Sequence, residues 1–231
     1  MRIFGTAKEL NWKYAVSEIL LIVIGVSIAL ATNSWYENRQ LRDDEIAALT
    51  QLQGTLREDL NGITGAYDTM GRINQEINLF VKNLDSDLSN HVDLTKGIRS
   101  NTRFVTLQLR NGPYETLKAR GTDLISNESL RVTITALYED EIPNLVEDSI
   151  IDRKLVRDIM LPAILEWAWL DNTDNWVAKD SVAAGWRSDL ATLGRHRART
   201  LNGFYLPSFE RTIELMREAL ADIDSELAQR N

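Results

Sequence analysis

The feature that most restricts the fold is an uncharged apolar stretch of 13 residues, Ile19–Ala31, near the N-terminus. It is flanked by four aromatic residues: Trp12, Tyr14, Trp35 and Tyr36. The two tryptophans are 23 residues apart, which is about 34 Å along a helix and matches the distance between the interfaces of a bilayer. Because aromatic side chains favour that level, the pattern predicts a transmembrane helix over residues 14–36 with these four residues at the membrane interfaces.

This division leaves residues 1–13 as a short tail and residues 37–231 as a soluble helical-bundle domain. A cleavable signal peptide is the main alternative, because the apolar core is short and Ala29-Leu30-Ala31 has the small-x-small form of a cleavage site. However, the aromatic pattern continues beyond that site, and no turn-forming break precedes the next helical pattern. We therefore favour a retained anchor in the lipid bilayer.

Three residues of the segment are candidates for contact with another transmembrane helix. Glu18 places a carboxylate just inside the first interface, where it either reaches the headgroups or faces a partner helix. Gly25 and Ala29 form a small-x-x-x-small pair that allows two helices to approach closely.

The charges around the segment indicate its orientation. Arg2, Lys8 and Lys13 precede it, whereas Arg39 and Arg42 follow it closely. The positive-inside rule then predicts a cytoplasmic N-terminus. In a bacterial inner membrane the C-terminal domain of this single-pass protein would be periplasmic.

Charge and cysteine content exclude several classes of partner and chemistry. The chain has a formal net charge of -8, the opposite of what a nucleic-acid-binding domain needs, so nucleic acid is not expected as a partner. It contains no cysteine, which excludes disulfides, thiolate metal sites and a cysteine nucleophile.

After the anchor, apolar residues recur every three or four positions in one register. They are Leu49, Leu52, Leu56, Leu60, Ile63, Tyr67, Met70, Ile73, Ile77, Val81, Leu84 and Leu88. Such spacing places them on one helix face, as in a bundle or coiled coil. A hairpin turning at Asn61–Gly65 is the alternative to one long helix over residues 41–88. The register does not shift there, so we favour the single helix.

The rest of the chain also reads as helical. We expect Ser86–Asn111 to be a loop with short local structure, and helices over 114–118 and 128–158, with Pro143 interrupting the second. A strict repeat from Leu206 to Leu227 predicts a C-terminal helix. No stretch resembles a set of strands, so the predicted fold is all-α: one transmembrane helix running into a long helix, then an antiparallel helical bundle.

Two stretches together resemble an uncharacterised family of bacterial single-pass membrane proteins that is defined only as a domain of unknown function. The first stretch is residues 14–39, where Ser17 replaces the glycine usual in the family. Its matching positions are Tyr14, Glu18, Gly25, Asn33, Trp35, Glu37 and Arg39. The second is residues 113–138, whose matching positions are Tyr114, Leu117, Gly121, Leu124, Ile125, Leu130, Arg131 and Tyr138.

The resemblance implies a membrane anchor followed by a helical domain, and it implies no activity. The second stretch itself reads as packing: Tyr114 and Leu117 share a helix face, and Gly121 suits a helix end. Arg131 is expected to hold a carboxylate inside the bundle.

Nothing in the sequence has the spacing of a catalytic, cofactor or metal site, and we predict a non-enzyme. The two histidines, His91 and His196, lack the spacing of di-iron or zinc sites. One acidic set reads most simply as a solvated helix face: Glu139, Asp140, Glu141, Glu147, Asp148 and Asp152.

Two features are candidate docking surfaces. Trp167 and Trp169 lie in the apolar run Met160–Leu170, which is too short to cross a bilayer; core packing is the alternative. Arg195, Arg197 and Arg199 form a local basic cluster, which either contacts headgroups or an acidic partner or makes internal ion pairs.

These features favour a non-catalytic, membrane-anchored accessory or structural subunit of a larger membrane protein complex. An energy-transducing assembly, respiratory or photosynthetic, is one host of that class. The alternative is an extracytoplasmic sensor or ligand-binding domain that works through a membrane partner.

Overall fold

The computed structural model describes residues 12–85, 94–178 and 185–230 of the 231-residue chain. The chain divides into two compact units, Met1–Ala47 and Ala48–Asn231. Helix α1 (Trp12–Leu84) is unbroken across Asn61–Gly65. The long helix predicted from the apolar register is therefore confirmed, and the alternative of a hairpin at those glycines is wrong.

The first unit contains the apolar part of α1. Among the described residues, α1 is the one helix long and apolar enough to cross a membrane, and no side chain of its apolar window is buried. Ile19, Leu21 and Leu30, for example, each expose more than half of their side-chain surface. Within this unit the polar residues at the end of the window bond locally, since Asn33 Nδ2 donates to Glu37 Oε1 at 2.7 Å.

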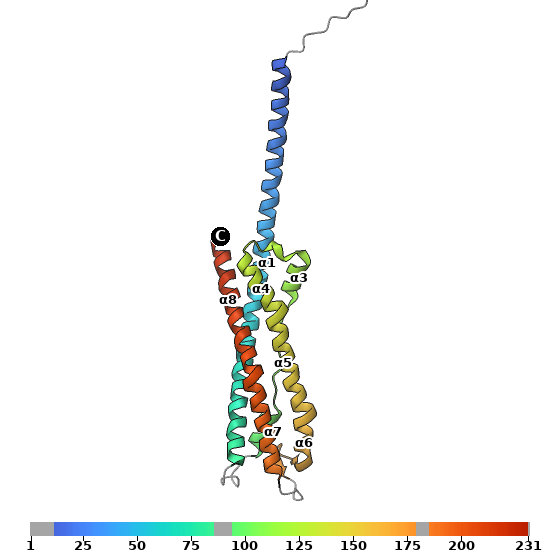
Figure 1. The fold of residues 1–231 in the computed structure, drawn as a ribbon, viewed down its shortest axis with the longest axis vertical. Coiled ribbons are helices and arrows are strands. Elements are labelled where there is room, and N and C mark those ends of the chain that lie inside the picture. The colour runs from blue at the N-terminus through green and yellow to red at the C-terminus, as the bar shows by residue number, and fades with distance from the viewer. Residues whose placement is uncertain (1–11, 86–93, 179–184, 231) are drawn as a thin grey trace, which may run out of the picture. The chain divides into compact units, whose positions relative to one another are not determined.

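The second unit is a helical bundle. Successive helices join end to end into three long rods, and shorter segments connect the rods. In order, the elements after α1 are α2 (Leu94–Thr102), α3 (Gly112–Arg120), η2 (Thr122–Leu124), α4 (Glu128–Ala136), η3 (Leu137–Glu141), α5 (Ile142–Lys154), η4 (Leu155–Met160), α6 (Leu161–Trp167), β1 (Ala168–Leu170), β2 (Trp176–Ala178), α7 (Trp186–Thr200), η5 (Leu201–Tyr205) and α8 (Leu206–Arg230). One rod is the part of α1 beyond Ala47, the second runs from α4 to α6, and the third from α7 to α8 (Figure 1).

Contacts between rods fix their directions. Arg57 meets Asp224 and Tyr67 meets Glu210, so α1 and α8 run antiparallel. The rod α4–α6 is also antiparallel to α7–α8, because Asn127 contacts Glu226 near one end while Asp152 contacts Arg197 further along. The predicted antiparallel helical bundle is confirmed.

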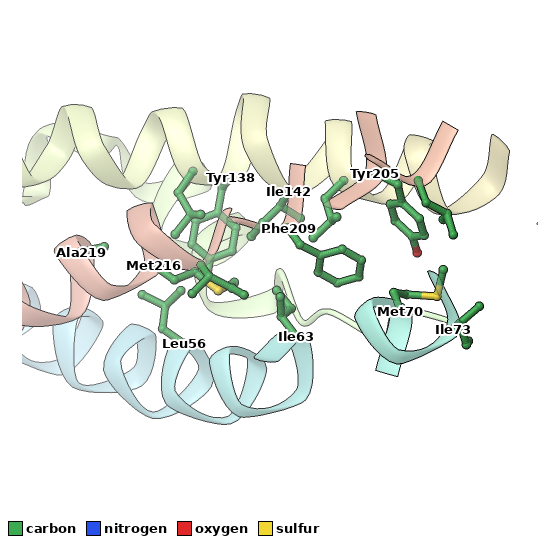
Figure 2. Close-up of a cluster of buried hydrophobic side chains, with 14 of the residues drawn as sticks. Leu56, Ile63, Met70, Ile73, Tyr138, Ile142, Tyr205, Phe209, Met216 and Ala219 are labelled. Carbon is green, nitrogen blue, oxygen red and sulfur yellow. The ribbon is translucent and has the colours of Figure 1, made fainter. Parts of the chain in front are cut away.

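The core of the bundle is built from the apolar faces of the three rods. Leu56, Ile63 and Met70 of α1 face Phe209 and Met216 of α8 across the interior (Figure 2). Each is at most 1% exposed, and full burial of such a side chain stabilises the fold by about 1.5–3 kcal/mol. Of the predicted α1 stripe, Leu60 and Tyr67 are partly buried, and Leu88 lies outside the described residues.

Three π-helical turns interrupt the rods, and each is followed directly by an X-Pro pair. The prolines are Pro143 after η3, Pro162 after η4 and Pro207 after η5. Proline has no N–H to donate, and its ring clashes with the carbonyl four residues back. A wider turn before it removes this clash without breaking the rod. The predicted interruption at Pro143 therefore occurs as a π-turn.

Two parts of the second unit differ from the sequence-based expectation. Residues 168–178 form a small antiparallel hairpin, in which Trp169 pairs with Val177 and Leu170 with Trp176. The sequence pattern did not predict this hairpin, but the predicted all-α class is confirmed, because the other regular elements of the described chain are helical. The expected loop Ser86–Asn111 contains helix α2 and, from residue 103 to 111, an extended segment; residues 86–93 lie outside the described part.

Glycine at position 97 is required by a close approach of two helices. A Cβ atom at Gly97 of α2 would overlap the ring of Phe80 on α1, which is itself only 5% exposed and cannot move aside freely. We expect Gly97→Ala to lower the free energy of unfolding of the full chain by about 1–3 kcal/mol, because overpacking outweighs the helix propensity of alanine.

The matched control is Gly54→Ala on α1, where a Cβ atom would meet nothing within 4 Å. That substitution should raise stability by up to about 1 kcal/mol. Urea unfolding of both variants in detergent, followed by circular dichroism, measures the difference. Equal stabilities would contradict the packing of α2 on α1.

Candidate functional site

The basic cluster on α7 does not form one docking surface. Arg197 is 0% exposed and lies in the bundle core. Arg195 is half-exposed, and its Nη1 donates to both carboxylate oxygens of Asp85, at 3.0 and 2.8 Å. Of the three, only Arg199 is exposed without an ion-pair partner among the described residues. Arg197 is therefore removed from the candidate surface, and the internal ion-pair alternative is correct for Arg195 and Arg197.

Arg197 is the centre of a buried polar network. Its Nε and Nη2 donate to the two carboxylate oxygens of Asp152 on α5, at 3.3 and 3.2 Å. Its Nη1 donates to the carbonyl oxygen of Ser100 at 2.9 Å, and its Nη2 also contacts the carbonyl oxygen of Arg103. One guanidinium thus joins α5 to α7 and caps the carbonyls at the end of α2.

Asp152 corrects the expectation of a solvated acidic face, because it is 1% exposed. Burial raises the pKa of Asp152, and the nearby Arg197 charge opposes this by lowering it. Burial likewise lowers the pKa of Arg197. A buried pair of this kind adds little net stability over an apolar pair, but leaving one charge unpaired is costly.

The sequence does contain a signal for both residues. Leu145, Ser149, Asp152 and Val156 follow one another in steps of four, three and four, as do Leu190, Gly194, Arg197 and Leu201. Each charge thus occupies a position of an apolar stripe. A charged residue at such a position must find a partner inside the protein.

The second motif of the family resemblance is a packing site. The rings of Tyr114 and Tyr138 stack with centroids 4.5 Å apart and planes 3° from parallel. Tyr114 Oη donates to Glu139 Oε1 at 2.7 Å, and Lys118 Nζ donates to the same oxygen at 2.6 Å. Burial, followed by the bond to Glu139, raises the pKa of Tyr114 to about 12. Glu139 therefore accepts two hydrogen bonds at the rim of this packing site, which differs from the expected solvated helix face.

Other expectations for this motif have mixed outcomes. Tyr114 and Leu117 are both buried on one face of α3, as predicted, and Gly121 ends that helix with φ 107°. Arg131 was expected to hold a carboxylate, but its Nη1 donates to the carbonyl oxygen of Ile125 at 3.2 Å. The motif therefore holds the α3–α4 connection together.

The tryptophan-rich run ends in the β1–β2 hairpin. Ala168 and Trp176 face the bundle, whereas Trp169 and Val177 form a cross-strand pair that is 48% and 38% exposed. The turn is built by Asp171, whose Oδ1 accepts from the backbone N–H groups of Thr173 and Asn175. Its Asp-Asn-Thr-Asp-Asn sequence was the turn signal that the sequence reading missed. The side chain of Trp167 lies outside the described residues.

One groove opens between α1 and α8. It has a volume of about 470 Å³ and is lined by Thr64, Tyr67, Asp68, Glu210, Ile213, Glu214 and Arg217. Tyr67 Oη donates to Glu210 Oε1 at 2.6 Å. Across the described residues, no three His, Cys, Asp or Glu side chains are placed to hold a metal ion together.

The predicted membrane residues lie on α1 in the first unit. Trp12, Trp35 and Tyr36 are exposed, and the guanidinium of Arg39 lies 5.7 Å from the ring centroid of Trp35. Glu18, Gly25 and Ala29 are also exposed, and the side chain of Tyr14 lies outside the described residues. No contact within the described chain covers this face of the helix.

The buried ion pair predicts a specific pattern of stabilities. Asp152→Ala or Arg197→Met should each lower the free energy of unfolding by about 3–5 kcal/mol, because each leaves an unpaired charge in the core. The double variant should lose less than the sum of the two single changes. Chemical denaturation of the full chain measures all three.

Arg195→Met is the matched control, because it breaks an exposed ion pair on the same helix. Its cost should be within about 1 kcal/mol. If Asp152→Ala, Arg197→Met and the double variant each lowered the free energy of unfolding no more than Arg195→Met does, the buried pair would not organise the bundle.

A comparison with protein families gives a match. The model described as "Family of unknown function (DUF6090)" matches residues 18–160, which is more than half of the chain. The matched region begins in the apolar part of α1, includes the Tyr114–Tyr138 packing site and ends at Met160 of η4. No curated protein and no solved structure matches the chain. The chain therefore belongs to the DUF6090 family of unknown function.

Proposed function

We propose that the protein is a non-catalytic, membrane-anchored accessory or structural subunit of a larger membrane protein complex. The observation that supports this most directly is the apolar part of α1, in which no side chain of the membrane-length window is buried. Ten large aliphatic side chains between Val16 and Leu30 are exposed. Their contact with water is unfavourable by about 25 cal/mol for each Å² of apolar surface. Hydrocarbon or another membrane helix removes that cost.

The same helix carries features that suit a protein partner as well as lipid. A Cβ atom added at Gly25 would meet nothing within 4 Å, so a second helix has room to approach this residue. Glu18, Gly25 and Ala29 recur at steps of seven and four, which places them on one side of the helix. A carboxylate and two small residues on one side suit helix–helix contact better than contact with lipid tails.

We place the N-terminus in the cytoplasm and the bundle in the periplasm of a bacterial inner membrane, on the basis of the flanking charges. A reporter enzyme that folds only in the cytoplasm should be inactive when fused after Asn231. An export-dependent reporter at the same position should be active. The opposite pair of results would reverse this topology.

Contact through the small-residue side of the anchor can be tested by enlarging it. Gly25→Ile together with Ala29→Ile should leave the protein in the membrane fraction after carbonate extraction, because the segment becomes more apolar. Recovery of co-purifying membrane proteins should fall at least tenfold, because the larger side chains hold the helices apart.

Val26→Ile is the control for this test, since position 26 is turned by about 100° from Gly25 on the helix. It should change neither membrane retention nor co-purification. Unchanged co-purification in the Gly25/Ala29 variant would show that the anchor contacts lipid alone.

The groove between α1 and α8 is the observation that favours the second candidate, a sensor or ligand-binding domain working through a membrane partner. Its lining carries three carboxylates, Asp68, Glu210 and Glu214, and one guanidinium, Arg217, and so suits a cationic organic ligand more than an anion. A protein purified as a lone monomer that binds a cationic ligand would support this role over that of a subunit.

A further inference from the structure

The segment between α2 and α3, residues 103–111, is extended in a unit that is otherwise mainly helical; we call it the strap. Its side chains alternate as in a strand. Val105, Leu107 and Leu109 are partly buried and pack against the bundle core. Phe104, Thr106 and Gln108 are exposed between them. The strap therefore lies flat on the bundle, with one face inward and one face outward.

The strap is held at its two ends. The carbonyl oxygen of Arg103 contacts the buried guanidinium of Arg197. At the other end the backbone N–H of Arg110 donates to Asp59 Oδ2 at 2.9 Å, and the Arg110 side chain pairs with Glu58. Asp59 is 4% exposed, so this second attachment point is also fixed by the bundle.

Between these points the backbone is unpaired. Within the described part of the chain, no N–H or C=O group from Phe104 to Leu109 has a hydrogen-bond partner. Six extended residues span about 20 Å and present two rows of donors and acceptors. Backbone groups of this kind require water or a neighbouring strand.

Solvent reaches the strap along its length. Val105, Leu107 and Leu109 remain partly exposed, although they pack against the core. Since every residue from Phe104 to Leu109 keeps exposed surface, no other segment of the described chain covers the strap.

This edge lacks the devices that prevent proteins from pairing edge to edge. Natural edge strands carry lysine, proline, a bulge or an inward-pointing charge. The strap reads Phe-Val-Thr-Leu-Gln-Leu from 104 to 109, with no charge and no proline. Valine, threonine and phenylalanine are also among the residues most favoured in strands.

We propose that the strap accepts an extended, acidic segment of another polypeptide as an added β-strand. Such addition pairs the free backbone groups, and alternate side chains supply the specificity. The charge of the partner follows from the surroundings. From Leu94 to Tyr114 the chain has four basic residues and no acidic one, although its net charge is -8. Arg110 already pairs with Glu58, so the charges that would attract an acidic segment are those of Arg99 and Arg103, which are both exposed.

A second copy of this chain is the poorer occupant. Two paired straps would bring two basic stretches together, which costs free energy at close range. The inference rests on the proposed function, because it names the surface through which an accessory subunit would hold a partner outside the anchor.

The first step of the test is to capture whatever lies on the strap. A photo-crosslinking amino acid is placed at Gln108 of the full-length protein in its native membranes, and at Glu218 on α8 as an exposed control position. An adduct with one other polypeptide at position 108, and not at 218, is expected. The crosslinked peptide is then identified by mass spectrometry and synthesised.

The second step asks whether that synthetic peptide binds by strand addition. Neighbouring residues of an extended chain direct their N–H groups to opposite flanks, so Val105→Pro and Thr106→Pro each remove a donor from a different flank. We expect one of the two to weaken peptide binding to full-length protein at least tenfold, whereas Thr106→Ser should not. These amides have no partner in the described chain, so both proline variants should retain the wild-type circular dichroism spectrum.

Hydrogen exchange of the wild-type protein provides a readout that does not depend on any variant. Amides 104–109 should exchange rapidly in the isolated chain, and alternate ones should be protected by the peptide. An adduct between two copies, a non-acidic captured segment, or peptide binding without protection of these amides would overturn the inference. If partners co-purify but none crosslinks at Gln108, only this inference fails; if no protein co-purifies at all, the proposed function fails with it.

Discussion

The second unit depends on the requirement that a guanidinium in its core be fully paired. Arg197 satisfies this requirement with Asp152 of α5 and with two backbone carbonyls, those of Ser100 and Arg103. Arg197 and its partners come from three segments far apart in the sequence, residues 100–103, 152 and 197. One side chain therefore joins α5, α7 and the junction between α2 and the strap. An apolar residue at position 197 could fill the same space, but it would leave the carbonyls at the end of α2 without donors.

The apolar periodicity was sufficient to predict the regular parts of this fold. The stripe from Leu49 to Leu84 and the repeat from Leu206 to Leu227 correspond to α1 and α8, because a register kept over many turns is compatible only with a helix. Short elements were beyond this reasoning. The β1 and β2 strands have three residues each, and the run Met160–Leu170 that leads into them has the composition of a buried helix.

The candidate surfaces were harder to predict, for a physical reason. A sequence shows that Arg195, Arg197 and Arg199 are close together along the chain. In a helix, however, successive side chains point in directions about 100° apart. Arg197 consequently points into the core while Arg195 reaches Asp85. The unpaired state of the strap depends on which segments lie beside it, and alternation in Phe104–Leu109 alone does not distinguish a paired strand from an unpaired one.

The two units share one property that bears on function. The apolar part of α1 exposes aliphatic side chains, and the strap exposes unpaired backbone groups. The hairpin adds an outward Trp169–Val177 pair. In the function that we propose, each of these surfaces would be completed by another molecule through non-covalent contact, whether lipid, a helix or a strand. A subunit of a membrane complex requires surfaces of this kind, and such a role needs no reacting group.

The most direct test of this account is the mass of the particle that contains the protein in its native membrane. The chain is extracted with surrounding lipid into nanodiscs under mild conditions, and the mass and polypeptide composition of the particle are measured. We predict a particle in which this chain and at least one other membrane polypeptide occur in a fixed ratio. A particle that contains a single copy of this chain and lipid alone would contradict the assignment as a subunit.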